Sequence, residues 1–400
     1  MSGFEIFDQE ERTTEFSIEK YADDLETERV PISGYGAQYQ SEADRVVKSE
    51  YETFDYSDCT FQDFPDIEEM EIMGCQVHGI TVQESWDTIE KWLEKIGKAD
   101  QVDMKKEVRV VSPQLGLDEN DEYFLFYDYM DQLESGEGAF ITNSLCHMQI
   151  AENGIYSMSD GKITEYLGYT TKTSRDALGS NQEETVEEGP YSVMKDKTYE
   201  LIDGELSVQE AAELVRDFFL AGTPFPCEEN VTVDIPEVRV FQLGDVYGYD
   251  LMVRRIYRSV PFAYTDYGYR QKPDMYSLSG DIKHAYVVDS SGVTAFAGYN
   301  ESEKLVSLAS GKEFIGVEQM AEKLTTDMAA SIDVHVRSVG LTYLPIGFSY
   351  FEDPEAKVVL PCWEVAGMDN SNGKEIRIYC DVFTGDIYYY TFRTEDDIEE

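Results

Sequence analysis

The chain has 400 residues, with 81 acidic and 32 basic side chains, so its formal net charge is −49. Phosphate backbones and anionic lipid heads attract basic protein surfaces, so this charge excludes a nucleic-acid-binding protein and disfavours adhesion to lipid. Apolar residues make up 42 % of the chain, which is enough for packed cores, yet no run approaches the ~18 apolar residues of a membrane span. At roughly 100–200 residues per domain, we expect several domains or a repeated smaller unit.

The order of polar and periodic segments predicts five parts. Residues 1–75 are strongly acidic, and we expect a leader that is partly disordered. Residues 76–168 form a first α+β unit, and residues 169–206 lack hydrophobic periodicity and are predicted to be a linker. A second α+β unit occupies 207–300 and a third occupies 301–400.

Three predicted helices support the idea of a repeat. Thr81 and Ser207 are each followed three residues later by glutamate, which is the pattern of a capping box. The third helix is expected to follow Gly316. Each helix has one apolar stripe; the stripes are Val82, Trp86, Ile89, Leu93 and Ile96; Val208, Ala211, Ala212, Val215, Phe218 and Phe219; and Val317, Met320, Ala321, Leu324 and Met328.

Segments rich in β-branched and aromatic residues follow every helix, and each series closes with a glycine-containing turn. The predicted turns are Ala151–Gly154, Asp289–Gly292 and Asp381–Gly385. One helix followed by antiparallel strands, three times over, predicts an α+β fold of repeated units, each a helix packed on a small antiparallel β-sheet.

The six cysteines include no CxxC pair, so neither a zinc ribbon nor a thioredoxin-type centre is indicated. Cys362 and Cys380 are expected on neighbouring strands joined by the turn Asp369–Gly373. Because side chains alternate along a strand, Cys380 shares a face with Ile378, whereas Cys362 lies opposite Trp363. We therefore expect two buried free thiols rather than a disulfide.

The C-terminal unit resembles PepSY-type domains. Leu360–Val365 reads LPCWEV and Gly373–Ile387 reads GKEIRIYCDVFTGDI, similar to a "P-x-W-x-V" strand followed by a strand ending in "D-A-x-T-G-x-I". Leu341–Pro345 resembles what precedes this pattern in extracytoplasmic regulatory proteins of the YycI and YycH kind. Residues 249–289 resemble the pattern more loosely, with Ser259 where glycine is usual.

The resemblance implies a PepSY-like fold for the third unit and a non-catalytic role. Such domains lie outside the membrane and restrain peptidases or tune sensor kinases. We therefore expect an extracytoplasmic, surface-anchored protein that binds a polypeptide partner without inserting into the membrane, lipid-anchored through a segment preceding residue 1. A cytoplasmic location is the alternative, because Met1–Glu5 lacks the features of a signal peptide.

No motif in the chain requires catalysis, so we predict no catalytic residue, metal site or cofactor. The four histidines have no metal-ligand spacing, and there is no G-x-S-x-G elbow or Walker loop. The second hypothesis is a glycan- or peptide-binding module for nutrient capture, whose candidate surface is Tyr264, Tyr267 and Tyr269. The third is a carboxylate-dependent hydrolase, which requires two facing acids with separated pKa values.

Overall fold

A computed structural model describes residues 28–77, 82–111, 138–142, 146–151, 155–159, 184–221, 231–243, 246–263, 283–299, 303–328, 332–347 and 357–391. The chain divides into two compact units, each made of separate stretches of sequence. Unit 1 contains Met1–Gln76, Ile256–Gly280 and Lys304–Glu400, and unit 2 contains Val77–Arg255 and Asp281–Glu303.

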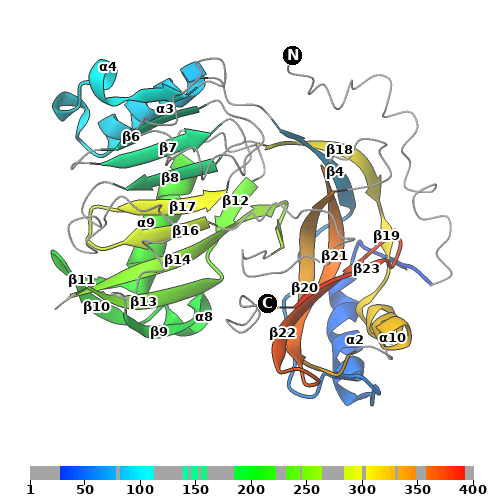
Figure 1. The fold of residues 1–400 in the computed structure, drawn as a ribbon. Coiled ribbons are helices and arrows are strands. Elements are labelled where there is room, and N and C mark those ends of the chain that lie inside the picture. The colour runs from blue at the N-terminus through cyan, green and yellow to red at the C-terminus, as the bar shows by residue number, and fades with distance from the viewer. Residues whose placement is uncertain are drawn as a thin grey trace. The chain divides into compact units, whose positions relative to one another are not determined.

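The main sheet of unit 2 is antiparallel wherever its strand pairs are described, and its strands follow the order β5-β6-β7-β8-β17-β16-β14-β13-β9 (Figure 1). A further strand, β12 (Val231–Asp234), also pairs with β14. Strand β15 (Val260–Pro261) pairs with Ile256 and Tyr257 at the end of β14, and these residues all belong to unit 1. The strands of the main order are β5 (Arg109–Val111), β6 (Gly138–Thr142), β7 (His147–Ala151), β8 (Ile155–Ser159), β9 (Glu184–Pro190), β13 (Glu237–Leu243), β14 (Val246–Tyr257), β16 (Lys283–Val287) and β17 (Ala295–Tyr299).

Helices and one hairpin complete unit 2. They are α3 (Val82–Lys95), η1 (Ala99–Gln101), α4 (Met104–Glu107), α8 (Tyr191–Met194), the hairpin β10 (Thr198–Leu201) with β11 (Gly204–Ser207), and α9 (Val208–Ala221). The capping box of α9 is confirmed, since Ser207 Oγ accepts from Glu210 N at 3.2 Å and Glu210 Oε2 accepts from Ser207 N at 2.9 Å. All six residues of the predicted stripe of α9 are buried.

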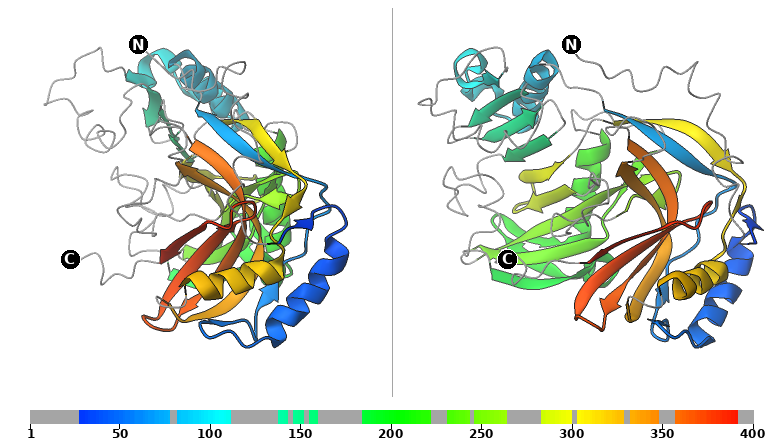
Figure 2. Two further views of the ribbon diagram at one scale, coloured as in Figure 1. Left: turned by 90° about the vertical axis from the view of Figure 1, so that its right-hand side faces the viewer. Right: turned by 45° about the vertical axis from the view of Figure 1, so that its right-hand side comes forward.

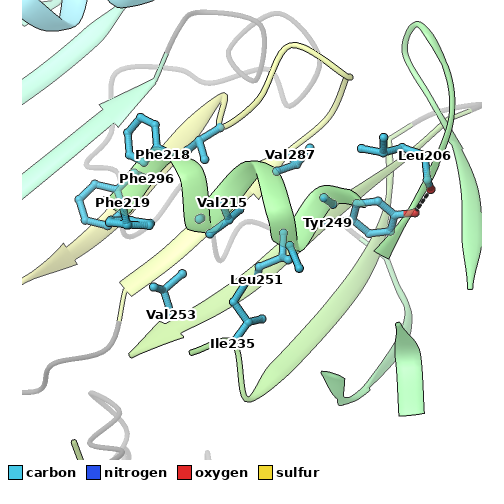
Figure 3. Close-up of a cluster of buried hydrophobic side chains, with 14 of the residues drawn as sticks. Leu206, Val215, Phe218, Phe219, Ile235, Tyr249, Leu251, Val253, Val287 and Phe296 are labelled. Atoms are coloured by element: carbon cyan, nitrogen blue, oxygen red, sulfur yellow. Dashed lines mark hydrogen bonds between the residues drawn. The ribbon is translucent and has the colours of Figure 1, made fainter. Parts of the chain in front are cut away.

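The core of unit 2 lies between α9 and one face of the sheet. Figure 3 shows Val215, Phe218 and Phe219 of α9 with side chains from β14, β16 and β17. Tyr249 lies in the same cluster and satisfies its hydroxyl group by donating to the backbone oxygen of Leu206 in β11. Burial of these apolar surfaces is the main stabilising contribution to the unit.

The sheet of unit 1 is built around two long antiparallel strands, β20 (Val334–Gly347) and β21 (Lys357–Asp369). Along its other side β21 pairs first with β4 and then with β22, so the sheet divides into two arms, β4-β18 and β22-β23. The remaining strands are β4 (Met70–Val77), β18 (Glu303–Gly311), β22 (Lys374–Asp381), β23 (Ile387–Thr391), and β2 (Phe54–Asp55) and β3 (Thr60–Phe61), which are parallel to β20.

Two helices pack together in unit 1, α2 (Gly36–Lys48) and α10 (Val317–Met328) (Figure 2). The short strands β1 (Val30–Pro31) and β19 (Glu313–Phe314) pair with each other. In the chain, β1 precedes α2 and β19 precedes α10. The predicted stripe of α10 is buried at all five positions, which confirms that helix. Helix α2 lies in the segment predicted to be a leader and was not predicted from the sequence.

The core beneath these helices is aromatic and is centred on Trp363. Its ring is stacked on Tyr39 at a centroid distance of 5.8 Å and on Phe314 at 5.9 Å, and its indole N–H donates to Ile315 O at 2.7 Å. Asp381 Oδ1 accepts from the backbone of Phe383 at 2.7 Å and of Thr384 at 3.1 Å, which fixes the predicted turn before Gly385. The sequence similar to the PepSY pattern thus forms a core strand and a tight hairpin.

The predicted α+β fold of repeated units, each a helix on its own small antiparallel sheet, is wrong. Helices followed by antiparallel strands do occur after α9 and α10, but their strands belong to large shared sheets. Strand β8 pairs with β17 through Ser159 and Ala295, which joins two of the predicted small sheets into one. Strands β2 and β3, from the predicted leader, pair with β20. Backbone atoms make these lateral bonds, so side-chain patterns carry little information about them.

The prediction for the cysteines is confirmed. Cys362 is opposite Asp381 and Cys380 is opposite Trp363, so the two thiols lie on opposite faces of the sheet. Both are free and fully buried, and burial raises their pKa values. The turns Asp369–Gly373 and Asp289–Gly292 also join antiparallel strands as predicted, whereas the turn predicted at 151–154 lies mostly outside the described residues.

A buried carboxylate ties α2 to the beginning of α10. Glu42 is 1 % exposed, and it accepts from the hydroxyl group of Tyr35 at 2.5 Å and from the amide group of Gln38. The same hydroxyl oxygen accepts from Val317 N at 2.8 Å, one of the amides that a helix leaves unpaired at its start. The positive end of α10 thereby favours the negative charge of Glu42.

Removing the hydroxyl group of Tyr35 is expected to destabilise unit 1, whereas removing the hydroxyl group of Tyr39 is not. Tyr35→Phe should lower the free energy of unfolding by about 1.5–3 kcal/mol, because it takes a hydrogen bond from a buried carboxylate. Tyr39→Phe should leave it unchanged or raise it, because the Tyr39 hydroxyl is buried without a hydrogen-bond partner among the described residues. Urea unfolding of both variants checks this, and equal losses would contradict it.

Candidate functional site

The tyrosines predicted to form a ligand surface, Tyr264, Tyr267 and Tyr269, lie outside the described residues. The candidate sites must therefore come from polar clusters and sheet margins elsewhere. Among the described residues, no group of three or more His, Cys, Asp or Glu side chains is placed to hold a metal ion.

The most buried charged cluster of unit 2 lies on the sheet face opposite α9. Asp250 in β14 is 5 % exposed, and its Oδ2 accepts from Arg239 Nη2 in β13 at 2.9 Å and from Nε at 3.2 Å. Its Oδ1 lies 2.9 Å from Nδ1 of His284 in β16. Both carboxylate oxygens thus connect the central strand to its two neighbours.

Electrostatics keep this carboxyl group ionised. Burial by itself raises the pKa of Asp250, but the charges and hydrogen bonds of His284 and Arg239 outweigh it and lower the pKa below its ordinary value. A carboxylate so occupied joins strands and is not poised to exchange a proton near neutral pH. His284 is one of the four histidines without metal-ligand spacing, and only the register of the sheet reveals its partner, 34 positions away.

A second polar cluster holds a strained turn in unit 1. Arg258 and Ser259 connect β14 to β15 and have φ values of 46° and 69°, a region that L-residues other than glycine rarely adopt. Glu71, 7 % exposed, accepts from Arg258 Nη1 at 2.7 Å and from the hydroxyl group of Tyr257 at 3.1 Å. These bonds hold the turn in its strained conformation.

Ser259 stands where the similar family pattern has glycine, and its positive φ gives the physical reason for that preference. Ser259→Gly is expected to raise the free energy of unfolding by about 0.5–1 kcal/mol, because glycine relieves the steric strain. Ser57→Gly, in the same unit and without positive φ, should bring no gain. Thermal unfolding of the two variants checks this, and a loss of stability in Ser259→Gly would show that the turn is unstrained.

The edge strands of the two sheets differ in how well they are protected against the addition of another strand. Strand β9 pairs only with β13 among the described strands, and it has the protective features of a natural edge. A register shift leaves Val186 as an extra residue, Pro190 ends the strand, and three glutamates lie along it. A bulge, a proline and repeated charge all oppose the addition of another strand.

Strand β18 is the longest weakly protected margin among the described strands of unit 1; the shorter β23 also contains neither charge nor proline. Strand β18 pairs only with β4 among the described strands, and its nine residues exceed the seven of β9 and the five of β23. Residues 305–311 contain neither charge nor proline, although 28 % of the chain is charged. Figure 1 shows β18 beside β4 at the margin of the unit 1 sheet. Long uncharged edges are the kind to which a further strand can bind.

Comparisons with known proteins identify no family. No protein-family model matches the sequence, and no curated protein is similar to it. The structure is similar to the crystal structure of an uncharacterized protein from Eubacterium rectale ATCC 33656, with a TM-score of 0.49 and 14 % sequence identity. The alignment covers 88 % of this chain and 98 % of that one. Among the described helices, none is long and apolar enough to cross a membrane.

Proposed function

We propose that the protein is a non-enzymatic binding protein that accepts an extended segment of a polypeptide partner at the outer edge of β18. The observation that carries the proposal is the contrast between the two margins. The chain protects β9 with a bulge, a proline and acidic residues, whereas β18 has charged residues only at its start, Glu303 and Lys304, and none over residues 305–311. Strand addition uses the backbone groups of such an edge for affinity and nearby side chains for specificity.

The net charge of −49 shapes how a partner arrives. It attracts a segment with basic residues beside the bound stretch, and it repels acidic proteins and a second copy of the chain. This attraction accelerates association more than it strengthens the complex, and salt screens it. A partner of this kind therefore associates more slowly at high ionic strength, while its dissociation rate changes little.

The resemblance of the C-terminal residues to PepSY-type domains gives this binding a role within the proposal. A partner that is a peptidase or a sensor protein is restrained or tuned by occupation of the β18 edge. The proposal includes an extracytoplasmic, surface-anchored location. Digestion of intact cells with a protease tests that part, because an exposed protein is degraded while a cytoplasmic marker survives.

Selection from a displayed library of random peptides tests the function itself. We expect enrichment of extended, uncharged stretches flanked by lysine or arginine. Ser307→Lys should weaken their binding at least about tenfold, because a charge placed on an edge opposes strand addition. Ser192→Lys is the matched control, since Ser192 is also exposed, lies on α8 and adds the same charge. The absence of enrichment, or equal binding by both variants, would contradict the proposed function.

A further inference from the structure

The burial of neighbouring strands indicates what kind of segment fits the β18 edge. Strand β4, the described neighbour of β18, is buried on both faces: Ile72 and Met73 point in opposite directions and are both 0 % exposed. Strand β18 keeps part of this cover on both faces: Leu308 on one face and Ala309 on the other are half-buried, whereas Ser310 and Ser307, which share those faces, are exposed. The cover on each face of the sheet therefore thins from β4 to β18.

The inner end of β18 supports the same conclusion. A Cβ atom at Gly311 would lie 2.4 Å from the ring of Phe383, so this end of the strand is closely packed. Ser307, on the same face, is exposed. A strand placed beside β18 would thus lie partly under cover on both faces, next to the half-exposed side chains of Leu308 and Ala309.

We infer, on the basis of the proposed function, that the bound segment is a continuous run of apolar and small residues rather than an alternating amphipathic strand. A strand with only one covered face alternates apolar and polar residues, whereas a strand covered on both faces has a near-continuous apolar sequence. Charged residues in the run would lose hydration beside Leu308 or Ala309 without gaining a partner. The basic residues that favour association lie outside the run, where they remain in water.

A second copy of the chain is the other occupant to consider, because residues 305–311 themselves form such a run. Two copies of the chain each have a net charge of −49, so electrostatic repulsion opposes their association. A short segment flanked by basic residues is not repelled in this way. The geometry therefore favours a separate polypeptide, and self-association is an outcome that the experiment below detects.

The test compares two synthetic peptides with identical lysine flanks and equal length. One has the central sequence Val-Thr-Leu-Ala-Val, and the other has Val-Lys-Leu-Glu-Val. In the second peptide, Lys and Glu occupy two positions on one face of the strand, and their opposite charges leave the net charge of the peptide unchanged. Fluorescence anisotropy measures the binding of each to the full chain, to Ser307→Lys and to Ser192→Lys. We expect the continuous peptide to bind at least about tenfold more tightly, and only Ser307→Lys to weaken it.

Each outcome separates the inference from the function on which it rests. Equal binding of both peptides, with loss in Ser307→Lys, would overturn the inference and leave edge binding intact. No binding of either peptide, or binding that Ser307→Lys does not change, would contradict edge binding itself. A concentration-dependent dimer in analytical ultracentrifugation that Ser307→Lys abolishes would overturn both, since the edge would then be an interface between copies.

Discussion

Asp250→Ala is expected to lower the free energy of unfolding of unit 2 by about 3 kcal/mol. Asp250 is 5 % exposed and interacts with both Arg239 and His284, so its removal takes a shared partner from two partly buried polar groups. Breaking a buried ion pair by removing one member costs about 3–5 kcal/mol, and we expect the lower end because Arg239 and His284 are 26 % and 32 % exposed.

The control for this prediction is Asp234→Ala. Asp234 pairs with Arg254 at 2.9 Å on the same sheet, but its side chain is 32 % exposed, so water can replace much of what it provides. We expect a loss of about 1 kcal/mol or less. Urea unfolding in a Trp363→Phe background reports on unit 2 through Trp86 and Trp92, which both lie in α3. Similar losses in the two variants would show that the Asp250 cluster has no special role.

The effect of pH on Asp250 follows from the direction of its pKa shift. Its pKa is lowered in the folded protein, so its stabilising contribution is fully present above the pKa of the unfolded chain and is lost as pH falls through the folded pKa. The difference in free energy of unfolding between wild type and Asp250→Ala should therefore close as the pH falls through the folded pKa of Asp250. A difference that stayed open in strong acid would contradict this assignment.

Trp363→Ala is expected to have an equal or larger effect on unit 1, about 3–5 kcal/mol. The indole ring is 0 % exposed, packs against Tyr39 and Phe314, and donates a hydrogen bond to Ile315 O. Its loss opens a cavity beneath α2 and leaves that carbonyl group without its donor. Because Tyr39 lies on α2, the loss should also expose residues 36–48 to proteolysis.

Two further variants separate packing from hydrogen bonding at this position. Trp363→Phe keeps most of the packing and removes the donor, so it should cost less than Trp363→Ala. Cys362→Ala changes the preceding residue, which is also fully buried but points to the opposite face, and should cost least. Far-ultraviolet circular dichroism during urea unfolding ranks the three. A loss in Cys362→Ala as large as in Trp363→Ala would mean that the aromatic cluster is not the centre of the core.

The sequence was informative where structure is local. The stripe and capping box of α9, the stripe of α10 and the turn before Gly385 depend on residues within a few positions of each other, and all are present. The separation of Cys362 and Cys380 also followed from alternation along adjacent strands. In each case a side chain either bonds to a nearby backbone group or occupies a position that the regular period of a helix or strand buries.

It was not informative where distant backbone segments pair. Nothing in Ser159 or Ala295 specifies that β8 joins β17, and the predicted separate small sheets failed for that reason. The acidic composition of the first 75 residues likewise concealed α2, whose buried face includes the charged residue Glu42. The proposed edge was missed as well, because an uncharged run becomes meaningful only once β18 is known to lie at the margin of a sheet.

Hydrogen–deuterium exchange of the full chain, with and without the continuous peptide, tests the central claim most directly. Strand addition forms backbone hydrogen bonds to alternate residues of the receiving strand. We therefore predict slower exchange at alternate amides within residues 306–310, and no comparable change in β9. Protection spread over another part of either unit, or unchanged exchange in β18 while the peptide is bound, would contradict the account.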